Sequence, residues 1–590
     1  MRWPSLALRW SLEALLSRRA SSRGGSFRWA VAGLGLALLV ASPVVATGPL
    51  DEVNRQLAMG RYEEAIKLLQ PMVESNPFNG EQAYTLGAAL AQAGRCDEAL
   101  PHLDRALALG MDGDRHGLRS ANLRAAECAA RNGDHAAAVE RIRRSWARHW
   151  AHGLDVDQLP ENGLYEPARQ LGLFEPLTGR TRQADVGGVG DRQRADLVYF
   201  DRLIRETHPD PFHTVSEEAW RQAVTTLDGQ IPMDSTSFTL GLMRLAARVH
   251  DGHTAVFPKI QGEGAWRLLP IYVRWLRDGW VIAAAAPDHE EIVGARIDGV
   301  AGKPLAEILE FARAATAREN DMAIQWLGGV FLQAYEIYEA AGVASEGRVA
   351  LDLTFAGGEQ RTVRLPAGPF DRHPGGRAAP PSWPAIGRDT LWLGSPGTLF
   401  STHWFEEHGA LYVQVNQMRD GVRLSMAEFA QSVFEELSER SAHSILIELR
   451  HNNGGNTPLV FQFLRAIDRY APLQEPGAII ALIGPRSFSA TMAMAGRLER
   501  DMNALFVGWP TGGRPSVYGT ERPFALPYSG ITGTIPVRWH QDGMGGNDTR
   551  PWIPPDFAVW PTWDDVLAGR DPVLDKALEL AKEVQARATP

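Results

Sequence analysis

The last third of the chain alternates short apolar runs with longer helical stretches, and this alternation constrains the fold more than any other feature. Four short runs are rich in apolar and β-branched residues: 411–416, 443–449, 478–483 and 504–509. Helical stretches follow the first three runs, near 425–439, 457–469 and 489–500. Such alternation predicts βαβ units and a mainly parallel sheet. Because parallel sheets bind ligands at the carboxyl ends of their strands, functional residues are expected in the loops after these runs.

A repeat occupies residues 50–150. GRYEEAIKLL begins at Gly60, GRCDEALPHL at Gly94 and GDHAAAVERI at Gly133, at spacings of 34 and 39 residues. This pattern resembles the tetratricopeptide repeat, in which each helical hairpin buries its apolar face by stacking on the next. We expect about three hairpins, with a helical extension to about residue 179. They would form either a groove for a protein partner or a packing extension of the next domain.

The first 46 residues are typical of a targeting segment. A basic leader precedes an apolar run from Trp29 to Ala46, and small residues close that run. We expect a cleaved signal peptide and a periplasmic or extracellular protein. The alternative is an uncleaved anchor, because the run approaches the roughly 20 residues that span a bilayer. Membrane association is expected only in that second case.

Charge and cysteine content exclude some functions. The chain has 60 Lys and Arg against 70 Asp and Glu, with no basic stripe, so a nucleic-acid partner is not expected. Cys96 and Cys128 are its two cysteines, too few for a thiolate zinc cluster. They form either a disulfide, which export permits, or two ordinary buried thiols. His250 and His253 lack a third ligand motif, and no metal or organic cofactor is predicted.

Between the repeats and the alternating region, the composition changes several times. We expect a Gly-rich linker at 180–192, a helical region at 195–256, a β-rich region at 265–365 and an irregular crossing segment at 366–404. The alternating domain then spans 405–580. Within the β-rich region, IVGARIDGVAGKPLAEIL resembles the end of a PDZ module.

Two loops that leave adjacent predicted strands carry candidate chemistry. ELRHNNGGNT contains Gly454 and Gly455, whose backbone N–H groups can point into a site and stabilise an oxyanion. IGPRSFSATM places Ser489 in the first turn of a helix, where the Ala490 N–H can join them. On chemistry alone, Ser487 is a competing nucleophile.

A serine hydroxyl needs a base within hydrogen-bond reach. No lysine lies between Ser489 and Asp575, so a local Ser–Lys pair is excluded. The best-placed histidine is His253 in VHDGHTAVF, at the end of a predicted helix. A neutral imidazole near pH 7 suits a general base.

These motifs together resemble the tail-specific (C-terminal processing) serine peptidases over about residues 195–575. ELRHNNGGN is similar to the D-x-R-x-N-x-G-G loop of that family, with Glu448 in place of Asp and with Arg450 and Asn452 matching. RSFSAT is similar to its nucleophile turn and places the family serine on Ser489. GWPTGGR carries Arg514 where one branch of the family has a catalytic lysine, and arginine stays protonated.

The departure at Arg514 favours the branch that resembles tricorn core protease. In that branch the base is a histidine in a turn like DGHT, which implies His253, and a late carboxylate orients it, which implies Asp548. The resemblance implies a ClpP/crotonase-like β-α catalytic domain with helical and PDZ-like accessory regions. It also implies a cofactor-free serine peptidase acting on peptide or protein substrates. The alternative is an inactive relative that binds a peptide or a hydrophobic ligand.

Overall fold

The computed structural model describes residues 49–109, 117–148, 163–174, 187–262, 264–369, 379–394, 397–545 and 548–588. The predicted leader at 1–46 lies outside these ranges. The chain falls into two compact units, Met1–Arg61 and Tyr62–Pro590. The first contributes helix α1 (Pro49–Ala58) to the description. Among the described helices, none has the length and apolar character needed to cross a bilayer.

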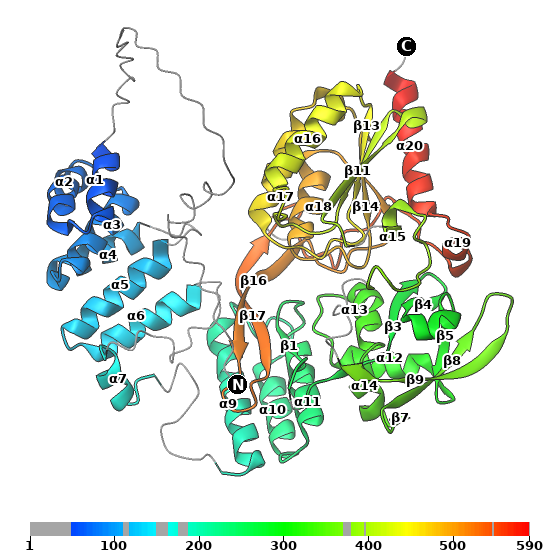
Figure 1. Ribbon diagram of the computed structural model, residues 1–590, viewed down its shortest axis with the longest axis horizontal. Helices are drawn as coiled ribbons and strands as arrows, with labels where there is room; N and C mark the ends of the chain where they lie inside the picture. Colours follow the sequence, from blue (N-terminus) through cyan, green and yellow to red (C-terminus); the bar gives the residue numbers. More distant parts are fainter. Residues whose placement is uncertain are drawn as a thin grey trace, which may run out of the picture. The chain divides into compact units, whose positions relative to one another are not determined.

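The second unit begins with antiparallel helical hairpins (Figure 1). Its helices are α2 (Tyr62–Ser75), α3 (Gly80–Gln92), α4 (Cys96–Ala108), α5 (Gly117–Arg131), α6 (His135–Arg148) and α7 (Glu166–Gln170). The repeated alanines Ala65, Ala99 and Ala138 are fully buried between helices. A disulfide joins Cys96 to Cys128 and so ties α4 to α5. Of the two alternatives for these cysteines, the structure contains the disulfide.

The next region combines three helices with a small antiparallel sheet. Helices α9 (Val189–Thr207), α10 (Glu217–Asp228) and α11 (Ser235–Ala247) lead to strand β1 (Ala255–Phe257). Strand β1 pairs with β17 (Thr532–Gln541), which pairs with β16 (Ser516–Ala525). A hairpin from late in the sequence therefore lies beside the helices, and the Phe200 and Phe524 rings meet at 5.8 Å.

The β-rich region forms a seven-stranded sheet in the order β3-β4-β5-β8-β7, with β6 paired to β5 and β9 paired to β8. Its strands are β3 (Ile271–Leu276), β4 (Gly279–Ala285), β5 (Arg296–Val300), β6 (Lys303–Pro304), β7 (Ala344–Ser345), β8 (Arg348–Thr354) and β9 (Gln360–Pro366). Its helices are α12 (Leu305–Ala314), α13 (Ile324–Phe331) and α14 (Tyr335–Ala340). Short strands β2 (Arg267–Leu268) and β10 (Gly368–Pro369) pair with each other.

The last third forms a six-stranded sheet in the order β11-β12-β13-β14-β15-β18. Its strands are β11 (Phe400–Phe405), β12 (Ala410–Val415), β13 (Ser444–Glu448), β14 (Ile479–Ile483), β15 (Leu505–Gly508) and β18 (Phe557–Ala558). All neighbours except β11 and β12 are parallel. The predicted α/β class, with an all-α repeat domain before it, is confirmed.

Helices cover both faces of this sheet, and every residue of its strands β12, β13 and β14 is therefore buried. Helices α16 (Met426–Glu439), α17 (Thr457–Asp468) and α18 (Ala490–Asp501) share one core with the sheet. Helix α20 (Pro572–Ala588) packs on the other face with the short helix α15 (Leu391–Gly394), and α19 (Trp563–Leu567) precedes it. Figure 1 shows α16–α18 and α20 on opposite sides of the strands.

A buried ionic cluster joins this sheet to α20. The guanidinium of Arg450 donates to Glu448 just before it in the chain and to both carboxylate oxygens of Asp571, which precedes α20. The Arg450 and Glu448 side chains are 0 % exposed. Glu448 replaces the aspartate of the motif, and its longer side chain still reaches Arg450. Arg450 therefore has a structural role, at the edge where the functional loops begin.

We predict that Arg450→Ala lowers the free energy of unfolding of the Tyr62–Pro590 unit by about 3–5 kcal/mol, because two buried carboxylates lose their cation. Urea unfolding monitored by circular dichroism measures this effect. Arg465→Ala removes an exposed arginine of α17 and is the matched control, expected within about 0.5 kcal/mol of wild type. Equal effects of the two substitutions would contradict the structural role of Arg450.

Candidate active site

Ser489 lies in a sharp turn between β14 and α18. Its φ is 56° and its ψ −124°, a conformation that a non-glycine residue rarely adopts and that costs about 1–3 kcal/mol. Such strand–turn–helix strain exposes a serine hydroxyl at the carboxyl end of a sheet. The turn needs Gly454 beside it, since a Cβ there would lie 2.5 Å from Ser489 Cβ. The side chain of Ser489 is half-buried and accessible.

Ser487, the competing nucleophile, has a different environment. Its side chain is buried, its hydroxyl donates to the Leu449 carbonyl at 3.1 Å and it accepts from the Gly484 N–H at 3.2 Å. These bonds hold the nucleophile turn against the end of β13. Ser487 is therefore a structural residue of the turn, and Ser489 is the better candidate.

His253 contacts Ser489 although the two residues are far apart in the sequence. Its Nε2 lies 3.0 Å from Ser489 Oγ, across 236 residues of chain. The turn between α11 and β1 places it: Asp251 accepts from the backbone N–H groups of His253 and Thr254 at 2.7 and 2.6 Å. The Phe488 ring stacks on the imidazole at a centroid distance of 4.6 Å. Two residues proposed from separate motifs thus form one hydrogen-bonded pair.

The carboxylate that faces His253 Nδ1 belongs to Glu319, in the segment between α12 and α13. Its Oε1 lies 3.6 Å from Nδ1, and both side chains are almost fully buried. Neither atom has a hydrogen-bond partner among the described residues, so each is the nearest group of opposite character for the other. The other oxygen, Oε2, accepts from the Arg514 N–H at 2.6 Å, and Arg514 Nε donates to the Glu319 carbonyl. Arg514 therefore holds the acid in place.

Asp548, which the family resemblance implied as the orienting acid, is engaged elsewhere. Its carboxylate accepts from the Arg550 guanidinium and from the Met544 N–H, and Arg550 also pairs with Glu499 on α18. Hydrogen bonds from Arg550 hold the pKa of Asp548 at about 2. Asp548 fixes a surface loop, and the structure gives the orienting position to Glu319.

Sequence reasoning missed Glu319 because no motif surrounds it. The available signal was a polar stretch, Arg318 to Asp321, within a region of otherwise apolar helices. A second acid, Glu521 on β16, was also missed, and its Oε1 lies 3.5 Å from His253 Nε2. It comes from the hairpin that crosses back to the helical region, which no local pattern indicates.

These carboxylates set the protonation of the base. Burial alone lowers the pKa of His253, but Glu319, Glu521 and Asp251 stabilise the imidazolium and together outweigh it. The pKa of His253 therefore stands above its ordinary value near 6.5. The neighbouring His208 helps to keep Asp251 ionised, through a contact of 3.2 Å, so the pKa of Asp251 is below its ordinary value despite its burial.

Backbone donors complete the site, although not in the expected set. The Gly454 N–H, predicted as an oxyanion donor, instead donates to Asn452 Oδ1 at 2.9 Å. The N–H groups of Gly455 and Ala490 have no hydrogen-bond partner in the part of the chain that the structure describes. Gly455 has a φ of 134°, and a Cβ there would strike the Met418 carbonyl. Within the described ranges, no group of three or more His, Cys, Asp or Glu side chains is placed to hold a metal ion.

Comparison with protein families and with curated proteins gives two findings. The family model described as "Tetratricopeptide repeat" matches residues 50–114, which confirms the repeat prediction there. No curated protein matches the sequence.

Several solved structures are similar. Mature CPAF is 14% identical, with 68% of this chain and 99% of that chain covered and a TM-score of 0.49. The photosystem II D1 C-terminal processing protease is 15% identical, with 62% and 93% covered and a TM-score of 0.32. The tricorn protease is 16% identical, with 68% and 37% covered and a TM-score of 0.32.

We predict that Glu319→Gln slows the reaction of Ser489 with a fluorophosphonate probe by about a hundred- to ten-thousandfold, because the amide no longer stabilises the imidazolium. Asp548→Asn is the control and should react at nearly the wild-type rate. Gel-based labelling time courses measure both. The opposite ranking of the two variants would restore Asp548 as the acid.

Proposed function

We propose that this protein is a serine peptidase that cleaves peptide bonds with Ser489 as nucleophile and His253 as general base. The observation that carries the proposal is the 3.0 Å contact between His253 Nε2 and Ser489 Oγ, at a backbone turn held in a strained conformation. A plain helix-capping serine would need neither the strain nor a buried histidine.

The proposed reaction uses only groups of this chain and water. Ser489 Oγ attacks the scissile carbonyl carbon while His253 Nε2 takes the hydroxyl proton. Negative charge develops on the carbonyl oxygen, and the N–H groups of Gly455 and Ala490 are free to donate to it. The imidazolium, stabilised by Glu319 at Nδ1, gives its proton to the leaving amine. Water then attacks the acyl-enzyme with the same proton path in reverse and releases Ser489.

We also propose that the protein is exported. The basic leader and apolar run of residues 1–46 motivate this, and the Cys96–Cys128 disulfide supports it, because disulfides persist in oxidising compartments. The repeats would then offer a surface to an extracytoplasmic partner. N-terminal sequencing of the protein recovered outside the cytoplasm, expected to begin near Thr47, tests the proposal.

We predict that Ser489→Ala and His253→Ala each lower kcat on unfolded casein by about a thousand- to a millionfold, and that the double variant is scarcely slower than either. Because Ser489 and His253 act together in one step, removing either one already abolishes their joint contribution to kcat. Ser487→Ala is the control and should retain turnover, although with reduced stability. Near-wild-type turnover in His253→Ala would refute the mechanism, and a folded wild type without turnover or probe labelling would favour a binding protein.

The pH profile gives a separate prediction. Activity requires neutral His253, whose pKa is raised, so the acid limb of kcat/KM should have its midpoint above about 6.5. Glu319→Gln removes a carboxylate that stabilises the imidazolium. The midpoint should therefore move to lower pH even as kcat falls, whereas Asp548→Asn should leave it in place. A midpoint that moves upward in Glu319→Gln would contradict the assignment.

A further inference from the structure

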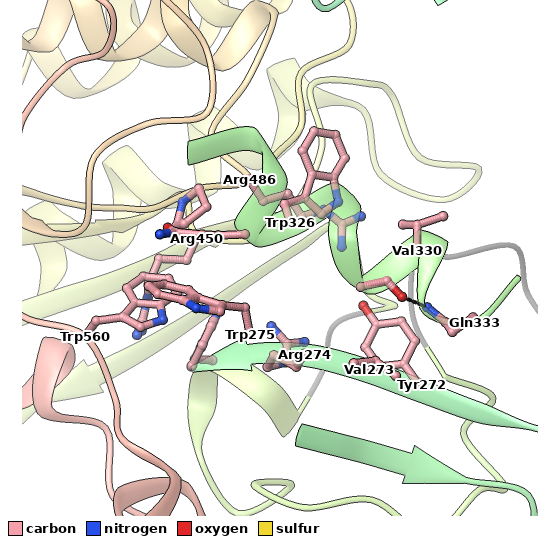
Figure 2. A pocket seen from close by; sticks show the side chains of 14 residues that line it. Tyr272, Val273, Arg274, Trp275, Trp326, Val330, Gln333, Arg450, Arg486 and Trp560 are labelled. Atoms are coloured by element: carbon pink, nitrogen blue, oxygen red, sulfur yellow. Dashed lines mark hydrogen bonds between the residues drawn. The ribbon is translucent and has the colours of Figure 1, made fainter. Parts of the chain in front are cut away.

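A pocket lies beside the nucleophile turn and is not used by the mechanism above. Strand β3, helix α13, the turn at Pro485–Arg486 and two tryptophans from other elements enclose about 500 Å³ of empty volume, counting its open mouth. Four tryptophans line it: Trp275, Trp326, Trp392 and Trp560. Figure 2 shows Arg274 beside Trp275, with Arg486 near Trp326 across the pocket.

Arg274 is the distinctive group in this pocket. Within the described ranges its guanidinium makes no hydrogen bond or ion pair, and its Nε is shielded from solvent without a partner. Its contacts are with tryptophan and tyrosine faces, at 5.0 Å from the Trp392 centroid and 5.8 Å from that of Tyr272. Arg450 in the same pocket differs, because Glu448 and Asp571 neutralise it.

The pocket is electropositive. Burial lowers the pKa of Arg274 below its ordinary value, and the neighbouring charges of Arg486 and Arg450 lower it further. The same three cations, added to burial, depress the pKa of His451 and keep that ring neutral. Arg274 is half-buried, with its Nε fully shielded, and a cation held away from solvent without a counter-ion is costly, so proteins pair such charges. An anion entering the pocket would supply the missing partner.

We propose that this pocket binds a carboxylate group of the peptide substrate through Arg274. A guanidinium presents parallel donors that match the two oxygens of a carboxylate, and tryptophan faces accept the apolar atoms attached to it. The carboxylate comes either from an Asp or Glu side chain or from the C-terminus of the peptide. This inference rests on the proposed peptidase function, whose site it extends.

The pocket is coupled to the nucleophile by covalent and ring contacts. Arg486 precedes Ser489 by three residues in the same turn. The Trp326 ring meets the Phe488 ring at 6.0 Å, and Phe488 stacks on His253. A carboxylate held by Arg274 is therefore at a fixed offset from the bond that Ser489 attacks, and the pocket selects which bond is cut.

The test separates binding from catalysis. Full-length Ser489→Ala protein is immobilised and offered tryptic casein peptides, before and after all their carboxyl groups are converted to methylamides. We expect amidation to lower peptide retention at least about tenfold, and Arg274→Gln in the same background to lower it equally. Arg277→Gln, an exposed arginine just after β3, is the matched control and should retain peptides normally.

Synthetic copies of the best-retained peptides identify the source of the carboxylate. If replacing Glu by Gln in the peptide abolishes retention, the pocket binds the side-chain carboxylate. If amidating the C-terminus abolishes retention, the pocket binds the terminal carboxylate. Absence of any retention, retention that survives full amidation, or unchanged retention in Arg274→Gln would each overturn the inference. Because this binding assay needs no turnover, failure of the proposed peptidase function shows separately, in the probe labelling of wild type.

A stability measurement excludes a merely structural role for the guanidinium. Removing a half-buried cation that has no counter-ion should leave the Tm of Arg274→Gln equal to or above that of wild type. Arg274→Lys, which keeps the charge without the two-pronged geometry, should show intermediate retention. If both variants lose peptide retention and also have a lower Tm than wild type, the inference is overturned, because Arg274 would then stabilise the folded core.

Discussion

The active-site geometry depends on one buried amide. Asn452 accepts from the Gly454 N–H and donates to the Val415 carbonyl at the end of β12. The backbone carbonyl of Asn452 accepts from the Phe488 N–H and from Thr491 Oγ1, on either side of Ser489. A single residue thus fastens the glycine loop to two neighbouring elements. The strain at Ser489 persists because these bonds leave the turn no relaxed alternative.

The rest of the site is assembled from distant parts of the chain. His253 comes from the helical region, Glu319 from the β-rich region and Glu521 from the β16–β17 hairpin. The hairpin is anchored to the helices because Asp196 on α9 accepts from two backbone N–H groups at its tip. Since the buried imidazole faces carboxylates from separate elements, its protonation reports whether those elements are correctly packed.

Sequence patterns predicted the parts of this arrangement that are local. Strand–helix alternation identified the sheet, and the two glycine- and serine-containing loops identified Ser489 and its surroundings, because both are consequences of backbone geometry at strand ends. His253 was identified by its turn. Glu319 was not, since its role depends on how the β-rich region packs against Arg514, and the occupied N–H of Gly454 depends on the Asn452 rotamer. Both features depend on tertiary packing, which the spacing of residues in the sequence does not reveal.

The distance along the chain between Ser489 and His253 has a consequence for biosynthesis. The nucleophile is made late, and the β16–β17 hairpin, which brings Glu521 to His253, is made later still. Until they have folded against segments made much earlier, no base faces the hydroxyl and no donors face a carbonyl. An emerging or unfolded copy is therefore chemically inert toward itself and its neighbours. For the proposed peptidase, the topology alone would delay hydrolysis until folding is complete.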